Sequence, residues 1–360
     1  MPKAKAKAKP KSRKNIRVGF IGAGGIARHH MGILSKLDKV KVAAASDVSD
    51  AALESVGSEY KNIKCFGDYK EMLAEAKIDA VSVCTPNYLH AQPAIDALNA
   101  GYPVIVEKPM AMNAEECQAM IDASTKNDQL LVVGFQYRYD KESQAVKRYI
   151  DDGQFGDIIY GRCKALRRRG IPNWGVFTRK DLQGGGPMID IGVHIIEVTH
   201  YLMGSPKPIS VSGNTYTYIG DQKEKSLNMA SSWSGWDYEN YTVEDLAVGL
   251  VKFENGATLS IEASFAMHGA DEHSAVIMGT KAGANLYPLK IFKDEAGAMV
   301  NVEPHFLPQT DGFTEKMKNW IHCIRTGDEP NAPAEHGLRV QQILDGVYRS
   351  AESGREVRYD

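Results

Sequence analysis

Two polar side chains stand four residues apart in the segment 184–194, which reads G-G-G-P-M-I-D-I-G-V-H. The pattern over 188–203 predicts a helix, and a helix places Asp190 and His194 on one face. A histidine close to a carboxylate can take up or release a proton near neutral pH. The pair is therefore a candidate acid or base that also contacts substrate. A structural pair, in which the two side chains are buried in the core and hydrogen-bonded to each other, fits the same spacing equally well.

A lysine follows an expected strand at 104–106, in the sequence Glu107-Lys108-Pro109. At the carboxyl edge of a sheet, an ammonium can hydrogen-bond a substrate oxygen or pass on a proton, especially where burial and neighbouring charges lower its pKa. The residues alone favour a plainer alternative, a surface ion pair between Glu107 and Lys108.

A glycine-rich turn at residues 22–27 reads G-A-G-G-I-A, a match to G-x-G-x-x-A. An apolar strand at 16–21 precedes it and a helix at about 26–37 follows, which is the context that dinucleotide binding requires. Gly22 permits the tight turn, and Gly24 lets the backbone approach a pyrophosphate at the helix N-terminus. The turn predicts a dinucleotide site.

Asp47 ends the second expected strand, 40–46, about 25 residues beyond the glycine turn. A carboxylate at this place can accept hydrogen bonds from both ribose hydroxyls and would repel a 2′-phosphate. NAD is therefore preferred over NADP. The alternative is a glycine turn with an aspartate that caps the next helix.

The segment C-T-P-N-Y-L-H (84–90) follows the expected strand 80–84. Loops at the carboxyl ends of parallel strands line the ligand crevice, which makes Thr85, Asn87 and His90 candidate cofactor contacts. Turn formation and helix capping would explain the same residues about as well.

Arg167, Arg168 and Arg169 end an expected strand at 158–168, so Arg167 and Arg169 should share one face. Arg167 is a candidate for binding a carboxylate or hydroxyls, although a solvated edge or an ion-pair network is the commoner role. Nearby loop-like sequence holds aromatic residues that could stack on a pyranose or anchor the core: Trp174, Trp233, Trp236, Tyr238 and Tyr241.

Alternating strands and helices between residues 15 and 138 predict β-α-β units and a parallel sheet. After residue 139 the rhythm changes to long strands at 209–219, 244–253, 257–265 and 274–279. Asn255-Gly256 between two of them is a hairpin signal. Two helices, 312–325 and 335–352, close the chain. We therefore expect an α/β Rossmann domain (15–138) and an α+β domain (139–360) for substrate binding and oligomerisation, with a mostly antiparallel sheet.

The composition of the 360 residues is that of an ordinary globular protein, without a run long enough to span a membrane. Five scattered cysteines favour reduced thiols in a cytoplasmic protein, and no Cys/His pairing indicates a metal site. Residues 1–14 carry seven basic groups and predict a disordered, solvated tail. The remaining 36 basic and 45 acidic residues argue against nucleic-acid binding.

Taken together and in this order, these motifs resemble the Gfo/Idh/MocA family (glucose-fructose oxidoreductase, inositol dehydrogenase, rhizopine catabolism). The likeness runs from about residue 16 to the C-terminus, and also includes G-F-Q-Y-R-Y (134–139) and A-E-H-G-L (334–338). It implies a catalytic set of Lys108, Asp190 and His194. It implies cofactor contacts from Gly22, Gly24, Ile26, Asp47, Thr85, Asn87, His90, Glu107 and Lys108.

The resemblance implies hydride transfer between nicotinamide and a secondary hydroxyl of a sugar, glycoside or cyclitol. His194 would take the hydroxyl proton, Lys108 would hydrogen-bond the same oxygen, and Asp190 would orient His194 or hold a neighbouring hydroxyl. Arg167 and Trp174 are the further substrate candidates. The open sheet of such proteins implies a homodimer or homotetramer, and we expect the C-terminal helices to pack back on the Rossmann domain.

Two other functions occur among similar proteins. An NAD-dependent glycosidase oxidises its substrate transiently and releases sugar without net NADH. A sugar-sensing regulator keeps the fold without catalysis, but it has no need of the intact set Lys108, Asp190 and His194.

Overall fold

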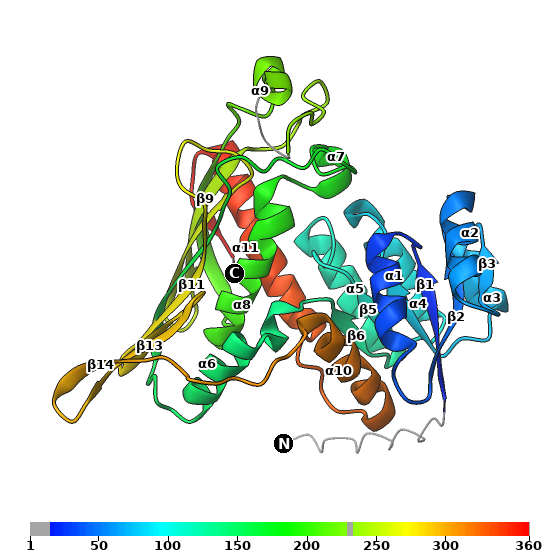
Figure 1. The fold of residues 1–360 in the computed structure, drawn as a ribbon, viewed down its shortest axis with the longest axis horizontal. Coiled ribbons are helices and arrows are strands. Elements are labelled where there is room, and N and C mark those ends of the chain that lie inside the picture. Colours follow the sequence, from blue (N-terminus) through cyan, green and yellow to red (C-terminus); the bar gives the residue numbers. More distant parts are fainter. Residues whose placement is uncertain (1–14, 229–232, 360) are drawn as a thin grey trace.

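The computed structural model describes residues 15–228 and 233–359, so the basic tail expected at 1–14 lies outside the described part. Two β-sheets stand apart, and helices fill the space between them (Figure 1). No helix in the described ranges is long and apolar enough to cross a membrane.

The N-terminal sheet has six parallel strands in the order β3-β2-β1-β4-β5-β6. Its strand sequences are short Val, Ile and Ala runs because helices cover both faces of the sheet. The strand order reverses between β1 and β4, and ligands bind at such a switch point. The strands are β1 (Ile16–Ile21), β2 (Val40–Ser46), β3 (Lys64–Phe66), β4 (Ala80–Val83), β5 (Val104–Val106) and β6 (Leu131–Val133).

Some helices of this domain begin at side chains that accept backbone N–H groups. Ser49, Asp68 and Asn113 cap three of them in this way. The helices are α1 (Gly25–Leu34), α2 (Asp50–Glu59), α3 (Tyr69–Glu75), η1 (Asn87–Leu89), α4 (Ala91–Asn99) and α5 (Ala114–Asn127).

The C-terminal sheet has nine strands in the order β14-β13-β12-β11-β7-β10-β9-β8-β15. Its pairs are antiparallel except β7 with β10, which run parallel. The bounds are β7 (Ile158–Leu166), β8 (Pro208–Tyr216), β9 (Leu246–Phe253), β10 (Thr258–Ser264), β11 (Glu272–Gly279), β12 (Ala282–Leu286), β13 (Leu289–Glu295), β14 (Ala298–Val302) and β15 (Val357–Arg358).

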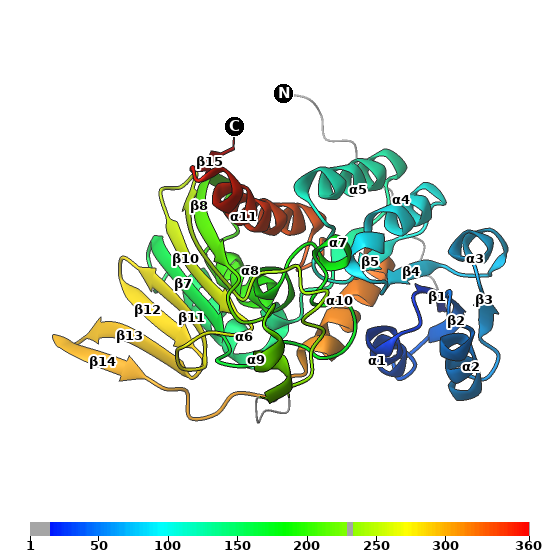
Figure 2. The same ribbon diagram turned by 90° about the horizontal axis from the view of Figure 1, so that it is seen from above.

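Helices cover one face of this sheet, and the other face is bare (Figures 1 and 2). The covering helices are α6 (Lys141–Asp151), the π-helix η3 (Met188–Gly192), α8 (Val193–Leu202) and α11 (Ala334–Ser353). The remaining elements are η2 (Tyr137–Tyr139), α7 (Lys180–Gln183), α9 (Lys223–Asn228) and α10 (Gly312–Thr326).

The end of the chain returns to the N-terminal sheet. Helix α10 packs against α1, where the rings of His29 and Phe313 meet edge to face at 4.8 Å. The backbone N–H of Val133 donates to the carbonyl of Ala332 at 3.2 Å, beside an isolated bridge from Val132 to Pro333. The last part of the sequence therefore covers the outer edge of β6.

A buried arginine joins the two halves of the molecule. Arg138 pairs with Glu197 of α8, and both side chains are fully enclosed. The same guanidinium lies 2.9 Å from Nδ1 of His336 and 2.6 Å from the carbonyl of Asn331. These contacts explain why Arg138 and His336 occur in two of the family motifs: they hold the fold rather than the reacting groups.

The fold class is confirmed: a parallel Rossmann-like sheet is followed by a mostly antiparallel, mixed sheet. The hairpin at Asn255-Gly256 is also confirmed, since Gly256 has φ +82 and connects the antiparallel strands β9 and β10. The expected helix at 188–203 is interrupted, because its first turn is a π-helix. Strand β7 ends at Leu166, so strand alternation does not orient Arg167, Arg168 and Arg169.

Candidate active site

The glycine turn opens onto a cavity of about 720 Å³ at the carboxyl ends of the parallel strands. Gly22 has φ +92, and a Cβ there would lie 2.7 Å from the carbonyl oxygen of Cys84. A Cβ on Gly24 or Gly25 would meet nothing within 4 Å, so this backbone is free to approach a ligand. Ile26 and Thr85 line the same cavity. The shape and the exposed backbone fit the pyrophosphate of a dinucleotide.

Asp47 lies at the same cavity, directly after β2. Its carboxylate accepts the backbone N–H of Ala23 at 2.7 Å and that of Ser49 at 2.9 Å. These bonds fix the acidic side chain against the glycine turn. Each oxygen keeps a further lone pair for a ribose hydroxyl.

Asn87 and His90 hold the loops of the site together and do not line the described cavity. The amide of Asn87 donates to the carbonyl of Gln183 at 3.0 Å, which ties the two halves of the chain together. The ring nitrogens of His90 lie 2.7 Å from the carbonyl of Pro109 and 2.9 Å from that of Thr85. Backbone carbonyls thus already engage both side chains, and a cofactor contact from either one stays a prediction.

Glu107 is buried and hydrogen-bonds the backbone of its neighbour, Lys108. Its carboxylate lies 2.7 Å from Nζ of Lys316 on α10 and 3.2 Å from Nε2 of His30 on α1. It also accepts the backbone N–H of Lys108 at 3.3 Å. Burial alone would raise the pKa of Glu107, but the charge of Lys316 and the hydrogen bonds from His30 and Lys316 hold it well below its usual range. The carboxylate is thus held by protein partners, and a direct cofactor contact from Glu107 stays a prediction.

Lys108 follows β5 and contacts Asp190 in the π-helix η3. Its Nζ donates to the backbone carbonyl of Asp190 at 3.2 Å and lies 3.6 Å from the Asp190 carboxylate. Both side chains are less than one-fifth exposed. The surface ion pair with Glu107 that the sequence favoured is therefore wrong, since Lys108 and Glu107 turn to different partners.

His194 faces the same region from α8. Its ring stacks on Tyr137 with centroids 5.0 Å apart, and its Nδ1 lies 3.2 Å from the amide nitrogen of Gln136. Burial lowers the pKa of His194 well below its usual value, and the positive charge of Lys108 lowers it further. The imidazole is therefore neutral at pH 7 and can accept a proton.

A second cavity, of about 390 Å³, brings the expected substrate residues together. Arg167 and Trp174 lie at its aromatic side, where the Trp174 and Trp233 rings are 5.0 Å apart and the Arg167 guanidinium is 5.1 Å from the Trp233 ring. Its lining is Tyr137, Ala165, Leu166, Arg167, Pro172, Trp174, Phe177, Asp190, Ile191, His194, Trp233, Glu272 and His273. Trp236 and Tyr241, by contrast, are buried in a small core.

The glycines that precede Asp190 allow close packing, and a buried glutamate holds the turn in place. The Glu244 carboxylate accepts the backbone N–H of Gly186 at 3.0 Å and of Met188 at 3.2 Å. Tyr348 of α11 donates its hydroxyl to the same group at 2.8 Å. A Cβ on Gly185 would lie 2.0 Å from that hydroxyl oxygen, so only glycine fits. Glu244 and Lys316 were not predicted from the sequence because no local pattern marks them. Gln136 lies in the motif G-F-Q-Y-R-Y, but the motif alone gave it no role.

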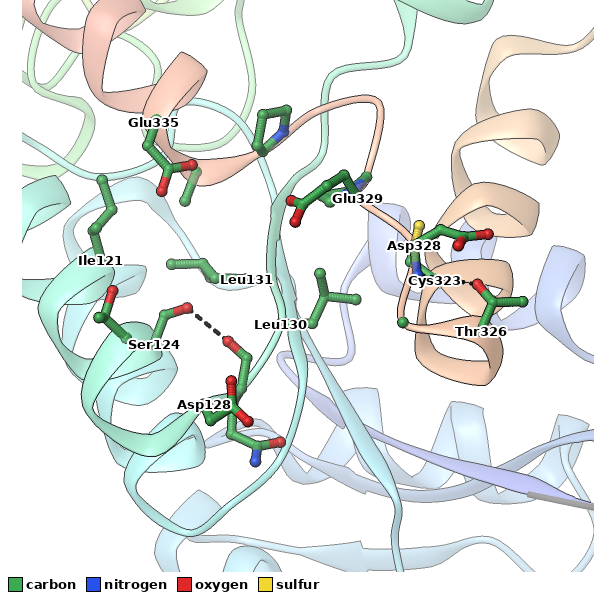
Figure 3. A pocket seen from close by; sticks show the side chains of 16 residues that line it. Ile121, Ser124, Asp128, Leu130, Leu131, Cys323, Thr326, Asp328, Glu329 and Glu335 are labelled. Carbon is green, nitrogen blue, oxygen red and sulfur yellow. Dashed lines mark hydrogen bonds between the residues drawn. The ribbon is translucent and has the colours of Figure 1, made fainter. Parts of the chain in front are cut away.

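A separate hollow of about 620 Å³ lies by the amino end of β6, between α5 and the α10–α11 connection (Figure 3). Its lining includes four acidic residues, Asp128, Asp328, Glu329 and Glu335. These negative charges would repel a pyrophosphate, so this hollow is unsuited to a dinucleotide. No group of three or more His, Cys, Asp and Glu side chains suited to a metal ion occurs within 15–228 and 233–359.

Two family models match the chain. Residues 16–135 match the oxidoreductase family with an NAD-binding Rossmann fold, and residues 147–359 match the C-terminal alpha/beta domain of the same oxidoreductase family. The chain belongs to the Gfo/Idh/MocA family. Several proteins of known activity are similar to this chain over almost its whole length.

D-glucoside 3-dehydrogenase of Escherichia coli (strain K12) is 34% identical over 95% of this chain and 97% of its own length. Inositol 2-dehydrogenase of Rhizobium meliloti (strain 1021) is 26% identical over 95% of this chain and 98% of its own length. A solved structure of levoglucosan dehydrogenase in complex with NADH has a TM-score of 0.81 at 22% identity, covering 96% of this chain and 99% of that one. The structural likeness concerns the fold.

Proposed function

We propose that this protein is an NAD-dependent dehydrogenase that oxidises a secondary hydroxyl of a sugar, glycoside or cyclitol. One observation carries the proposal: Lys108 Nζ lies 3.2 Å from the backbone of Asp190, while Asp190 and His194 line the cavity that also holds Arg167 and Trp174. A cation, a carboxylate and a neutral imidazole thus converge at one end of a site with aromatic walls.

The roles of the three groups follow from their charges. Neutral His194 accepts the hydroxyl proton. The Lys108 ammonium donates a hydrogen bond to the same oxygen and stabilises the negative charge that develops there. Asp190 holds Lys108 and is placed to accept a hydrogen bond from a neighbouring hydroxyl. When bound, NAD supplies the nicotinamide carbon that takes the hydride.

Gly22, Gly24, Ile26, Asp47 and Thr85 would hold the cofactor, since these residues surround the 720 Å³ cavity. We propose NAD rather than NADP because the Asp47 carboxylate, fixed by Ala23 and Ser49, would repel a 2′-phosphate. Asn87, His90 and Glu107 would act indirectly, through the loops that they anchor.

A D-glucoside is the substrate that we propose first. The relative at 34% identity is named as a D-glucoside 3-dehydrogenase. The ring pair of Trp174 and Trp233 adds support, because aromatic faces stack on the apolar face of a pyranose or on an aglycone.

The bare face of the C-terminal sheet supports a homo-oligomer, a dimer or tetramer. Strand register places Leu250, Met278 and Phe292 on that one face, and each is more than 40% exposed. Light scattering coupled to size exclusion would measure the assembly. A cytoplasmic location is proposed because all five cysteines are free thiols.

The test of function uses purified protein with NAD and a panel of glucosides, free sugars and inositols. Absorbance of NADH and product mass are followed together. We expect NADH and a product two mass units lighter, since two hydrogens are removed. Cleaved glycoside without net NADH would instead establish a glycosidase. Binding without turnover of any panel member would favour a sensor.

A further inference from the structure

The side chain of Gln136 contacts Nδ1 of His194, the proposed catalytic base. Its amide nitrogen lies 3.2 Å from His194 Nδ1. Gln136 is 7% exposed, and its Oε1 is buried without a hydrogen-bond partner among the described residues. The bond to His194 is therefore the one that decides which end of the amide faces the imidazole.

The two ends of the amide demand different forms of the imidazole. Where Gln136 donates an N–H to Nδ1, the proton of neutral His194 must sit on Nε2. Nε2 then has no free lone pair, and it cannot accept a proton from a substrate. Where the amide is turned by half a rotation, Oε1 accepts Nδ1–H and Nε2 presents its lone pair. Because Gln136 engages Nδ1, Nε2 is the nitrogen left for a ligand in the cavity that His194 lines.

The surroundings of His194 keep the imidazole neutral, so its tautomer determines whether it can act as a base. Lys108, Lys316 and His273 oppose protonation of the ring and Glu107 favours it, with burial as the largest effect. Asp190 lies one turn earlier on the same helical segment, and Tyr137 stacks on the ring at 5.0 Å. With the imidazole neutral, the position of its single proton decides whether it can act as a base.

We propose that Gln136 is a positioning residue that selects the tautomer of His194. This inference rests on the proposed function. In the form competent for oxidation, Gln136 Oε1 accepts Nδ1–H, and Nε2 faces the substrate as a base. The substrate O–H bond breaks as an Nε2–H bond forms, and the imidazolium keeps its Nδ1–H donated to Oε1. When bound, NAD would supply the acceptor for the hydride of the broken C–H bond, and His194 would later release its proton to water.

A neutral amide suits this position better than a carboxylate. It fixes the tautomer without adding a charge, so His194 keeps the lowered pKa that lets it return its proton. A carboxylate would also accept Nδ1–H, but it would stabilise the imidazolium and raise the pKa of His194.

The test compares Gln136→Met, Gln136→Glu and a matched control, Gln92→Met. Gln92 lies at the surface of α4, and its side-chain amide donates to Asp96 at 2.7 Å. The readouts are histidine ¹⁵N shifts in the NAD-bound enzyme, kcat and KM for the best glucoside, and the pH profile of kcat. The signal of His194 is assigned by its loss in His194→Gln, and thermal unfolding confirms that each variant folds.

We expect wild-type His194 to carry its proton on Nδ1. Gln136→Met should mix the tautomers and lower kcat at least about tenfold with KM nearly unchanged. Gln136→Glu should keep the Nδ1–H form and recover kcat at high pH, with the acidic limb of the profile shifted upward by about one pH unit. Gln92→Met should match wild type in every readout.

An Nε2–H tautomer in the NAD-bound wild type, or a Gln136→Met enzyme with unchanged kcat, would overturn the inference. Its failure is distinct from failure of the proposed function. The ¹⁵N shifts report the tautomer even without turnover, whereas full activity of His194→Gln would remove His194 as the base.

Discussion

The ammonium of Lys316 lies 2.7 Å from the carboxylate of Glu107, although 209 residues separate them along the chain. Neither side chain has appreciable contact with solvent. Because Glu107 also accepts the backbone N–H of Lys108, a helix near the C-terminus fixes the start of the segment that carries the proposed catalytic lysine.

Removal of the ammonium in Lys316→Met should leave a buried carboxylate without its partner. We expect the free energy of unfolding to fall by about 3–5 kcal/mol, measured by urea denaturation. Lys318→Met is the matched control, since its pair with Glu315 is on the surface and should be worth less than about 1 kcal/mol. Equal effects of the two substitutions would contradict the buried-pair argument.

Lys108→Met should separate chemistry from cofactor binding. Loss of a donor to the reacting oxygen lowers kcat by roughly 10²–10³-fold, while the Kd for NAD should stay within a few-fold of wild type. Stopped-flow rates and NAD titration measure the two effects. Lys126→Met, an exposed change on α5, is the control. A Lys108→Met enzyme that turns over normally would remove Lys108 from the mechanism.

Asp47→Asn should weaken the preference for NAD. The amide keeps the size of the side chain but loses the charge that repels a 2′-phosphate and holds the ribose hydroxyls. We expect roughly tenfold weaker NAD binding and tighter NADP binding, because hydrogen bonds to charged groups are worth about 1.5–3 kcal/mol. Fluorescence titration with both cofactors measures this, with Asp50→Asn on α2 as control. An unchanged NAD-to-NADP ratio would mean that Asp47 does not select the cofactor.

Trp174→Ala should raise KM for glucosides more than it lowers kcat. The ring is half-exposed and lines the substrate cavity beside Trp233. Stacking worth about 0.5–1.5 kcal/mol corresponds to a two- to tenfold change. Phe306→Ala, another exposed aromatic outside this cavity, is the control. A kcat defect at constant KM would argue against a substrate-stacking role.

Acid should destabilise the fold through its buried histidines. Burial lowers the pKa of His30 to about 4 and those of His200 and His336 to about 3. The unfolded chain therefore binds more protons below pH 6.5, and stability is full above that value and lost as pH falls toward 3. Each histidine contributes a slope of about 1.4 kcal/mol per pH unit in this window.

Buried carboxyl groups with a raised pKa act in the opposite direction. Burial raises the pKa of Asp140 and of Asp345 to about 6, so their contribution is present at low pH and lost as pH rises through 6. We still expect a net loss on acidification, measured by urea denaturation from pH 7 to 4. His336→Asn keeps a side-chain oxygen that can accept a hydrogen bond from Arg138. It should reduce the slope of the free energy of unfolding against pH by the contribution of one histidine. A stability that rises on acidification would show that the carboxyl groups dominate.

Local patterns explain what the sequence predicted. The glycine turn and Asp47 lie on consecutive strand, helix and strand elements, so their spacing determines their geometry. Asp190 and His194 occupy adjacent turns of one helical segment, even with a π-helix in its first turn.

Contacts between segments that are far apart in the sequence could not be predicted. Gln136 meets His194 from 58 residues away, and Glu244 holds Gly186 across a similar separation. Their side chains are ordinary polar residues until the chain is folded, and no periodicity marks them.

The strands β12–β14 were missed for another reason. Ala282–Leu286 reads A-G-A-N-L, a sequence poor in strand-forming residues. The parallel pairing of β7 with β10 was not predicted either. The relative direction of two strands depends on the chain that connects them, and neither strand sequence shows it.

The return of the C-terminus to β6 has a consequence for synthesis of the protein. The sheet that carries the glycine turn is translated first, yet its outer edge bonds to Ala332 and its helix α1 rests on α10. Until roughly nine-tenths of the chain has left the ribosome, the nascent sheet keeps an unpaired edge and an uncovered apolar surface. The cofactor-binding half thus reaches its final form only when translation is nearly complete.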